Sequence, residues 1–343
     1  MMAASASRVA VIGAGIAGAS CARWLHDAGY AVQVFDKSRG VGGRLSTRRI
    51  DWTDAAGVSH QASFDHGAPG FQARSPAFAA FAARAHANGL LLPWQPRDPA
   101  GRAAADADTW WLPAPDMPAL CRALLQDLPV QTQAPIDALH RDAAGWRLAS
   151  AGATVAREFG AVVLAIPPAQ AAALLQPLAP SWARQALALP MLPDWTLMGL
   201  ASAAGDASDW QLAHPSDGVL ASIIRNHGKP GRAPLAGMAH WVAHASADWS
   251  ARHIETPAAV VQEALQQALA RWFGQAPDWR YVTVHRWRYA VAPAGARSGT
   301  DRCWWDAQAG LGVCGDAWGG GGVEGAWGSA RALAAAISGV DPA

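Results

Sequence analysis

Lysine, cysteine and long hydrophobic runs are scarce in this sequence, and each shortage excludes a class of protein. Only two of the 27 basic residues are lysines, Lys37 and Lys229, and the formal net charge is +1. Because no run is rich in lysine or arginine, we expect no nucleic-acid partner. No stretch of about 18 apolar residues occurs, so we expect no membrane partner. The N-terminus lacks the pattern of a secretory signal, which predicts a cytoplasmic protein.

The few cysteines indicate neither a metal site nor a disulfide framework. Cys21, Cys121, Cys303 and Cys314 are widely scattered, and no two of them have the spacing of a zinc site or a redox motif. Buried free thiols in a reducing compartment are the favoured interpretation.

Apolar residues and tryptophan are plentiful. Hydrophobic residues make up 51% of the 343 residues and charged residues 15%, so the chain can bury the cores of about two domains. The 18 tryptophans far outnumber the three tyrosines. Tryptophan either packs in a core or lines a pocket for a flat aromatic ligand, and composition does not separate these two uses.

The hydrophobic patterns predict an α/β protein that begins with a βαβ unit. A buried strand over residues 8–12 leads through a glycine turn into a helix that ends at Gly29, and a second strand covers 31–35. Further helices are predicted over 76–88, 117–128, 257–273 and 323–338, strands within 60–74, 130–163, 195–290 and 310–314, and an irregular segment over 93–108. Several strands with one covering helix after residue 195 indicate a separate antiparallel sheet.

The glycine motif after the first strand is typical of a dinucleotide-binding turn. Gly13 permits the tight turn, Gly15 lets the backbone approach a pyrophosphate, and Gly18 lets the helix pack close to the strand. The helix N-terminus then offers free N–H groups to the phosphates. Asp36 ends the second strand about twenty residues on, where a carboxylate can accept hydrogen bonds from ribose hydroxyls. The motif does not separate NAD from FAD.

A second glycine-rich segment, Val41-Gly42-Gly43-Arg44, follows Asp36 closely. Its glycines suit a close approach of the backbone to a ligand, and Arg44 can pair with phosphate. A surface loop with an exposed arginine is the alternative, and the position behind the first motif favours the site.

The third segment lies near the C-terminus, where a strand ends in Gly315-Asp316 and a glycine loop leads to a helix over Val323-Glu324-Gly325. Asp316 can accept hydrogen bonds from a polyol chain, and the helix N-terminus can stabilise negative charge on a reduced flavin. A glycine loop capped by an acidic residue is common without any such role.

Together these segments resemble the flavin amine oxidase superfamily of FAD proteins, as does the strand that runs into Ile166-Pro167-Pro168. The resemblance implies that the first two segments bind the ADP half of FAD and that the third binds its ribityl and flavin end. It implies noncovalent FAD, because the contexts of Cys303 and Cys314 do not resemble the flavin-linking motif. The cofactor-binding residues expected on this basis are Gly13, Gly15, Ile16, Ala17, Gly18, Asp36, Lys37, Gly42, Gly43, Arg44, Gly67, Ala68, Val130, Gly315, Asp316, Val323, Glu324 and Gly325.

Further stretches look like bacterial renalase-type proteins. They are Phe64-Asp65-His66-Gly67-Ala68 with Arg74, Trp241–Ala245 with Trp249-Ser250, His285–Ala290 and the ending GDAWGGGGVEGAW. The resemblance implies an oxidase that takes a hydride from dihydro isomers of NAD(P) onto flavin N5 and returns the electrons to O2, giving H2O2. One departure is that Pro69-Gly70 stands where that family has Gln-Tyr, which would reshape the floor of the pocket.

The catalytic candidates are His66, His244, Trp287 and Tyr289, with His285 as a further acid–base candidate. For each histidine a structural role on a strand is the alternative. Trp287 and Tyr289 alternate with two arginines along one strand, so the aromatic pair shares one face, which either packs a nicotinamide or belongs to the core. Arg225 and Asn226, which end an apolar strand, can contact a phosphate, although a solvated turn is the simpler interpretation.

Three rival functions remain open at this point. An amine oxidase of the superfamily typically has a lysine that reaches flavin N5 through water, and only Lys229 could serve here. A desaturase of isoprenoid substrates would need a more apolar surface. A related fold serves in binding proteins that escort lipidated small GTPases without flavin chemistry, and the intact glycine motif argues against that function.

The resulting expectation is a two-domain flavoprotein with a Rossmann-like FAD domain and a substrate domain of mainly antiparallel sheet plus helices. The FAD domain is expected over residues 1–65, 115–168 and 297–343, and the substrate domain over 66–114 and 169–296. A small-molecule substrate, such as a reduced nicotinamide nucleotide, and O2 are the expected reaction partners.

Overall fold

The computed structural model describes residues 8–54, 56–103, 109–203, 209–233, 235–293 and 302–342. The chain divides into two compact units. Unit 1 comprises Met1–Gly43, Pro118–Met191 and Ala292–Ala343, and unit 2 comprises Arg44–Met117 and Leu192–Val291.

Unit 1 is built on a mostly parallel sheet. Its strands are β1 (Arg8–Ile12), β2 (Ala31–Phe35), β8 (Val130–Gln131), β12 (Ala161–Leu164), β18 (Trp304–Asp306) and β19 (Leu311–Val313). They form a six-stranded sheet in the order β18-β19-β12-β1-β2-β8, in which only β18 runs antiparallel to its neighbour. The central strand β1 is apolar and buried from Val9 to Ile12, as expected for a strand covered on both faces.

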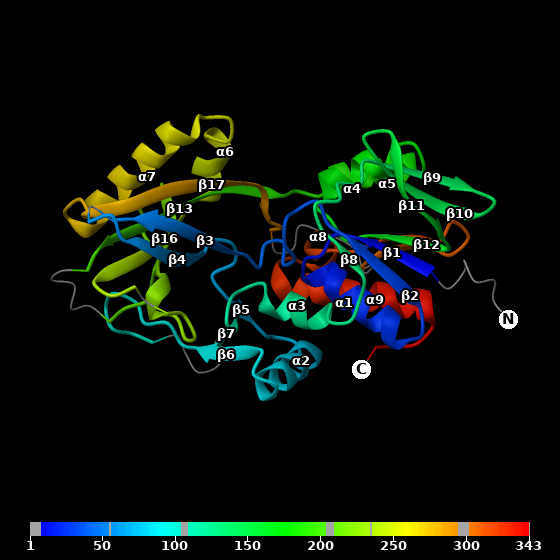
Figure 1. Ribbon diagram of the computed structural model, residues 1–343, viewed down its shortest axis with the longest axis horizontal. Coiled ribbons are helices and arrows are strands. Elements are labelled where there is room, and N and C mark those ends of the chain that lie inside the picture. Colours follow the sequence, from blue (N-terminus) through cyan, green and yellow to red (C-terminus); the bar gives the residue numbers. More distant parts are fainter. Residues whose placement is uncertain are drawn as a thin grey trace. The chain divides into compact units, whose positions relative to one another are not determined.

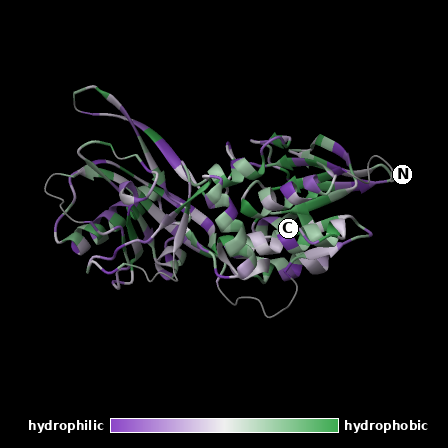
Figure 2. Ribbon diagram, turned by 90° about the horizontal axis from the view of Figure 1, so that it is seen from below, coloured by the Kyte–Doolittle hydropathy of each residue, from purple (hydrophilic) through white to green (hydrophobic). Residues whose placement is uncertain are grey.

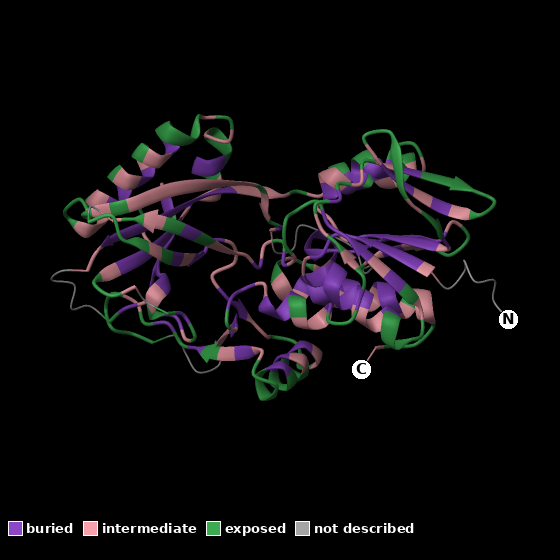
Figure 3. Ribbon diagram, viewed as in Figure 1, coloured by how far each residue is buried: buried purple, intermediate pink, exposed green. Residues whose placement is uncertain are grey.

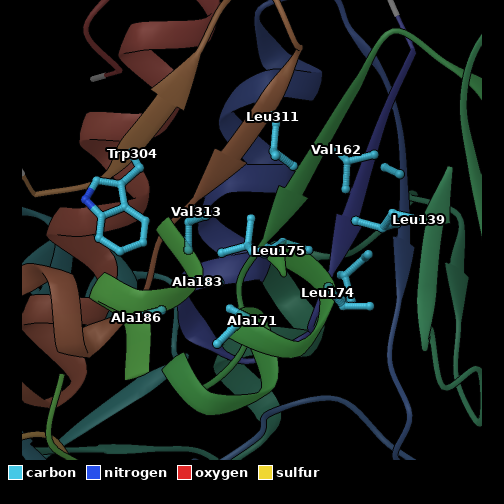
Figure 4. Close-up of a cluster of buried hydrophobic side chains, with 14 of the residues drawn as sticks. Leu139, Val162, Ala171, Leu174, Leu175, Ala183, Ala186, Trp304, Leu311 and Val313 are labelled. Carbon is cyan, nitrogen blue, oxygen red and sulfur yellow. The ribbon is translucent and has the colours of Figure 1, made fainter. Parts of the chain in front are cut away.

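Layers of other elements cover both faces of this sheet (Figure 1). The helices α1 (Ile16–Asp27), α3 (Ala119–Leu124) and α9 (Gly322–Ser338) pack together on one side, preceded by the short α8 (Asp316–Gly319). The strands β9 (Ala138–Asp142), β10 (Gly145–Ser150) and β11 (Ala153–Phe159) and the helices α4 (Pro168–Leu175) and α5 (Pro180–Leu187) lie on the other side. Figure 4 shows Val162, Leu174 and Leu175 in the apolar cluster that joins α4 to the sheet.

Unit 2 is mainly antiparallel. Its elements are β3 (Thr47–Thr53), β4 (Ser59–Asp65), β5 (Phe71–Gln72), α2 (Pro76–Ala87), β6 (Leu91–Trp94), β7 (Trp110–Pro113), β13 (Leu192–Ser202), β14 (Leu212–Ala213), β15 (Leu220–Arg225), the 3₁₀ turn η2 (Asn226–Gly228), β16 (Met238–Ala245), α6 (Ala247–Arg252), α7 (Ala258–Phe273) and β17 (Trp279–Val291). They form a five-stranded sheet in the order β14-β15-β16-β13-β17, the β3–β4 hairpin, and a three-stranded sheet in the order β5-β7-β6.

The five-stranded sheet has two different faces because successive side chains alternate. Trp195 and Leu197 of β13, together with Trp241 and Ala243 of β16, point into the apolar cluster that α7 covers. Figure 3 shows α7 exposed on its outer side and buried toward the sheet. The residues between these positions point to the opposite face, which carries histidine, threonine and aspartate side chains.

The predicted fold class, a Rossmann-like α/β unit with a second unit of mainly antiparallel sheet, is confirmed. Several details differ. The helix expected over 117–128 is confined to α3, and α4, α5 and α6 were not anticipated. Part of the irregular segment, residues 104–108, lies outside the described residues.

The bounds of the two units also differ from the predicted domain bounds. Segment 44–65 forms the β3–β4 hairpin and belongs to unit 2, where β4 contacts β16. Segment 169–191 belongs to unit 1, because its helices pack on the sheet there. The predicted return to the first domain at residue 297 lies outside the described residues.

No helix of the described residues is long and apolar enough to cross a membrane. Figure 2 shows hydrophilic and hydrophobic residues mixed along the longer helices.

Candidate functional site

The three glycine-rich segments of unit 1 gather at one edge of its parallel sheet. The strands β1, β2, β12 and β19 run in the same direction, so their carboxyl ends share an edge. The turn at Gly13 follows β1, Asp36 follows β2, and Gly315 comes shortly after β19. In open α/β sheets this edge is where ligands bind.

The first glycine turn is built as the motif predicts. Gly13 adopts a φ of +108°, and a Cβ there would lie 2.3 Å from the carbonyl oxygen of Ala165. A Cβ on Gly18 would lie 1.8 Å from the carbonyl oxygen of Gly13, so α1 packs directly against the turn. Gly15 differs, because its φ is −75° and a Cβ would meet nothing closer than 3.8 Å. The chain itself therefore requires glycine at 13 and 18, but at 15 it leaves room for a Cβ in ordinary van der Waals contact.

The second glycine segment pairs with the first. Gly42 donates its N–H to the carbonyl oxygen of Ala14 at 2.9 Å, and Gly15 and Gly42 form a parallel bridge. Gly43 has a φ of +57°, and a Cβ there would lie 3.3 Å from the Cα of Gly15. The two segments thus form one cradle of bare backbone, which we call the glycine cradle (residues 13–18 and 42–43).

The Asp36 carboxylate is buried and holds the cradle in place. Its Oδ2 accepts a hydrogen bond from the Ala14 N–H, and its Oδ1 accepts one from the Ser38 N–H, both at 2.7 Å. Each carboxylate oxygen retains a second lone pair. Asp36 can therefore organise the turn and still accept hydrogen bonds from a ligand.

The N-terminus of α1 has no side-chain cap and no acidic residue in its first turn. Ile16 and Ala17 of that turn are buried, so their backbone rather than their side chains would face a ligand. Among the other predicted residues, Lys37 is exposed, and Val130 is half-buried in β8 next to β2. Uncapped N–H groups at a helix start are suited to phosphate.

The C-terminal segment forms the short helix α8 and the first turn of the longer helix α9, with glycines between them. Gly315 has a φ of +156° and donates its N–H to the Ser329 hydroxyl at 3.0 Å. Asp316, which is buried, begins α8. A Cβ on Gly319 would lie 1.8 Å from the carbonyl oxygen of Gly325, so α8 and α9 are in direct backbone contact. Val323 and Glu324 are half-buried in the first turn of α9.

Three further predicted cofactor residues lie in unit 2. The Arg44 guanidinium donates a hydrogen bond to the carbonyl oxygen of Ala290 at 3.1 Å. Ala68 donates its N–H to the carbonyl oxygen of Arg44 at 3.0 Å, and a Cβ on Gly67 would lie 2.0 Å from that oxygen. The segment 44–68 is therefore closed on itself by backbone contact. Each of the three residues is half-buried.

The departure at Pro69-Gly70 has a packing reason. A Cβ on Gly70 would lie 3.0 Å from ring carbon Cε3 of Trp110 and 3.0 Å from Cδ2 of Leu112. An aromatic ring from β7 thus fills the space beside this turn, and a tyrosine at position 70 would not fit without movement.

A buried ion cluster anchors Asp65, the residue before His66. Its Oδ2 lies 3.2 Å from Lys229 Nζ and 2.8 Å from Arg232 Nε, and its Oδ1 accepts a hydrogen bond from the Thr47 hydroxyl at 2.7 Å. The Asp65 and Lys229 side chains are 0% exposed. Burial alone would raise the pKa of Asp65, but Lys229 and Arg232 hold it below the ordinary value. Burial lowers the pKa of Lys229, and Asp65 offsets part of this change.

The prediction of a solvated turn at Arg225-Asn226 is wrong, because both residues are buried. Asn226 Oδ1 accepts a hydrogen bond from the Asp65 N–H at 3.1 Å, and Asn226 Nδ2 donates to the Ser63 carbonyl oxygen at 3.2 Å. The Arg225 guanidinium lies over the rings of Trp210 and Trp241. These polar groups hold the fold of unit 2 together.

The face of the five-stranded sheet opposite α7 carries a row of polar side chains. Thr196 of β13 is directly paired with His244 of β16 on one side and with His285 of β17 on the other. Asp194, two residues before Thr196, is paired with Trp287. Asp194 Oδ2 lies 2.7 Å from His244 Nδ1 and accepts a hydrogen bond from the Thr196 hydroxyl at 2.8 Å.

His66 joins this row. Its ring centroid lies 5.0 Å from that of His285 and 5.2 Å from that of Trp287, and Trp287 Nε1 donates a hydrogen bond to the His66 carbonyl oxygen at 3.0 Å. Burial, with His285 and Arg48 nearby, lowers the pKa of His66 to about 3. Burial and Arg48 also lower the pKa of His285. His66 is therefore neutral at physiological pH.

The faces of β17 are divided as expected. Arg286 and Arg288 lie on the opposite face of the strand from Trp287, and both form ion pairs with Glu255. Tyr289 is half-buried two residues after Trp287. Its position on the strand places it on the same face as Trp287.

Sequence reasoning missed Asp194, Thr196 and Arg48 as members of this region. The available signal was weak. It consists of polar residues at alternate positions of otherwise apolar strands, and such residues point to the same face of the sheet because side chains alternate along a strand. Their meeting with His244 depends on strand register, which the sequence does not reveal.

These observations define the chain as a dinucleotide-binding α/β protein with a second, antiparallel unit. The chain belongs to the family of flavin-containing amine oxidoreductases, whose family model matches residues 106–338. A second family model, that of the NAD(P)-binding Rossmann-like domain, matches residues 11–85.

Solved structures with the same fold are similar over nearly the whole chain. A provisionally assigned protoporphyrinogen oxidase from Exiguobacterium sp. 255-15 has a TM-score of 0.68 at 12% identity and covers 96% of this chain and 98% of its own. Cyclohexylamine oxidase from Brevibacterium oxydans IH-35A has a TM-score of 0.64 at 15% identity, with coverage of 97% and 98%. An oxidoreductase from Methanosarcina mazei has a TM-score of 0.59 at 14% identity, with coverage of 95% and 99%. At these identities the similarity shows the fold alone.

The family implies a flavin, and the residues of unit 1 fit FAD. The glycine cradle presents bare backbone at Gly15, the start of α1 is uncapped, and Asp36 retains acceptor capacity. Together these features suit a pyrophosphate and a ribose. Among the described residues, no group of three or more His, Cys, Asp or Glu could hold a metal ion.

Proposed function

We propose that this flavin-dependent oxidoreductase is a renalase-like oxidase of dihydronicotinamide-type substrates. The glycine cradle, Asp36 and the Gly315-Asp316 segment would hold FAD noncovalently. Bound FAD would supply the acceptor of a hydride and would then reduce O2 to H2O2. The residues of the polar face in unit 2, His66, His244, Trp287 and Tyr289, would orient the substrate, because hydride transfer depends mainly on positioning.

The burial of Lys229 is the observation that favours this function over amine oxidation. A lysine that serves a flavin through water has to present its ammonium to solvent or ligand. The Lys229 side chain is 0% exposed, it is paired with Asp65, and it lies over the Trp94 ring. The other lysine, Lys37, follows β2 in the cofactor unit. The burial and pairing of Lys229 therefore argue against its use as the lysine of an amine oxidase.

The cysteines support noncovalent cofactor binding. Cys21, Cys121 and Cys314 are buried free thiols, and Cys303 is half-buried. A hydrogen bond with Cys21 and burial raise the pKa of Cys314, and burial raises the pKa of Cys121 to about 12. A thiol must ionise to attack, so Cys121 and Cys314 are poor candidates for a covalent link.

Oxygen consumption tests the proposal. The purified protein is supplied in turn with the 2- and 6-dihydro isomers of NAD, ordinary NADH and simple primary amines. We expect rapid O2 uptake with the isomers and one H2O2 formed per NAD⁺. Uptake with amines alone would instead indicate an amine oxidase, and a protein that never binds FAD would fit the escort-type binding function.

A further inference from the structure

Three buried acceptor atoms on the polar face of unit 2 have no hydrogen-bond partner among the described residues. They are His66 Nδ1, His244 Nε2 and Asp194 Oδ1. His66 and Asp194 are 6% and 8% exposed. Buried polar atoms without partners are costly, and they commonly mark the place of a ligand or an unseen water. The three residues are neighbours. His244 is hydrogen-bonded to Asp194, and His66 stacks on Trp287, which is the cross-strand partner of Asp194.

The hydrogen bonds around these atoms determine which of them can donate. Asp194 Oδ2 accepts from His244 Nδ1, which selects the His244 tautomer that carries its proton on Nδ1 and presents a lone pair at Nε2. Thr196 donates to the same carboxylate and keeps it in place. His66 is neutral and bonds to the Phe64 backbone through its other ring nitrogen, so its Nδ1 is also an acceptor. All three atoms therefore accept hydrogen bonds and none donates.

We propose that this cluster recognises a planar ring that carries an uncharged N–H donor group, specifically a primary carboxamide. The half-buried Trp287, stacked with His66 and edge-on to His285, supplies the aromatic wall. His244 and His66 accept the two N–H groups, and Asp194 is a positioning residue that fixes the His244 tautomer. The inference rests on the proposed function and deepens it, because it names the substrate group that the site reads.

The charges around the cluster are of both signs, so an ammonium and a carboxylate would each meet one charge that repels it. Arg48 from β3 lies close enough to His66 and His285 to act electrostatically on both rings. Its positive charge disfavours an ammonium ligand. A carboxylate ligand would find no donor on the three acceptor atoms, and it would face the negative charge of Asp194. A neutral donor avoids both penalties.

Three ligands with the same ring test this assignment: benzamide, benzoate and benzylamine. Binding to the FAD-loaded protein is measured by isothermal titration calorimetry at pH 7.5, where benzylamine is protonated. We expect benzamide to bind at least about tenfold more tightly than the other two, since a tenfold ratio corresponds to one well-made hydrogen bond. Tightest binding of benzylamine or of benzoate, or no binding of benzamide, would overturn the proposal.

Matched variants locate the recognition. His244→Phe keeps an aromatic ring but removes the acceptor, so benzamide affinity should fall at least about tenfold. His244→Gln provides an amide oxygen as acceptor and should bind more tightly than His244→Phe. Asp194→Asn retains an oxygen that accepts from His244 Nδ1 and should keep part of the wild-type affinity. Glu255→Gln, on the opposite side of the sheet, is the control and should bind like the wild type. Unchanged affinity in a folded His244→Phe protein would contradict the proposal.

The two proposals can fail separately. If dihydronicotinamide isomers reduce the flavin but benzamide does not bind, the carboxamide assignment is wrong and the proposed function stands. If benzamide binds as expected and the isomers do not reduce the flavin, the recognition site stands and the proposed function is wrong.

Discussion

Two buried carboxylates, Asp36 in unit 1 and Asp65 in unit 2, engage their neighbours in different ways. Asp36 binds two backbone N–H groups and retains acceptor capacity toward the glycine cradle. Asp65 is surrounded by cations, a hydroxyl and an amide. The first is suited to a ligand and the second to the fold, and substitution separates these roles.

Replacing Asp36 should weaken cofactor binding. Asp36→Ala removes a charged acceptor that the proposed ribose would use, so the Kd for FAD should rise about tenfold or more. Flavin content after gel filtration and FAD titration of the stripped protein measure this change. Asp27→Ala, an exposed carboxylate at the end of α1, is the control. Wild-type flavin content in the Asp36 variant would contradict its assignment.

Replacing Asp65 should cost more stability than replacing its partner. Asp65→Asn leaves Lys229 and Arg232 as buried cations without a counter-charge, and the free energy of unfolding should fall by about 3–5 kcal/mol. Lys229→Met leaves Asp65 paired with Arg232, so its cost should be smaller. Asp278→Asn, in an exposed ion pair with Arg280, should change stability by less than about 1 kcal/mol. Urea unfolding measures all three, and equal losses would show that the cluster is not coupled as described.

At the scale of secondary-structure elements, the glycine cradle combines positions that the chain needs with a position that the ligand needs. Gly18 contacts the Gly13 carbonyl, whereas Gly15 has an ordinary conformation and leaves room for a Cβ. The motif in the sequence predicts all three glycines but does not say which of them serve the fold.

Two alanine substitutions should separate these requirements. Gly18→Ala places a methyl group against backbone and should lower the free energy of unfolding of the FAD-free protein by about 3 kcal/mol or more. Gly15→Ala should leave the melting temperature of the FAD-free protein within a few degrees of wild type and yet weaken FAD binding strongly, because the methyl group occupies the space for the pyrophosphate. Normal FAD affinity in Gly15→Ala would place the pyrophosphate elsewhere.

Local pattern was enough to predict the elements around the cradle. The strands 8–12 and 31–35 match β1 and β2, because apolar runs bounded by glycine and aspartate are local signals. The pairing of Asp194 with His244 could not be predicted, because the two residues are fifty positions apart and meet through register. The cluster of Asp65 with Lys229 and Arg232 also depends on contacts between distant segments. The sequence does not predict that segment 44–65 belongs to unit 2, because a hairpin gives no sign of which sheet it joins.

At the scale of the whole molecule, buried neutral histidines should make stability depend on pH. Burial lowers the pKa of His66 to about 3 and that of His240 to about 4, from an ordinary value near 6.5. Between the folded and the ordinary pKa of each ring, the unfolded chain binds a proton that the folded chain does not. The stability that the neutral rings contribute is therefore fully present above pH 6.5 and is lost as the pH falls. Asp65, with its depressed pKa, adds a further loss only below about pH 4.

The melting temperature should therefore fall steadily from pH 6.5 to pH 4.5, with about two protons taken up on unfolding at the lower end. A protein carrying His66→Asn and His240→Gln should show a flatter profile over this range. Differential scanning calorimetry at several pH values measures both. Parallel profiles for the wild type and the double variant would show that these two rings are not the source of the pH dependence.

The proposed function requires that the chain hold FAD noncovalently and accept a hydride from a dihydronicotinamide isomer. An anaerobic visible-absorbance titration tests it most directly. Acid precipitation first establishes that the yellow cofactor is released, and the 2- and 6-dihydro isomers of NAD are then added stepwise. We predict bleaching of the flavin at one isomer per FAD, with NAD⁺ as the product and full return of colour in air. A flavin that the isomers leave oxidised, but that amines bleach, would contradict the account.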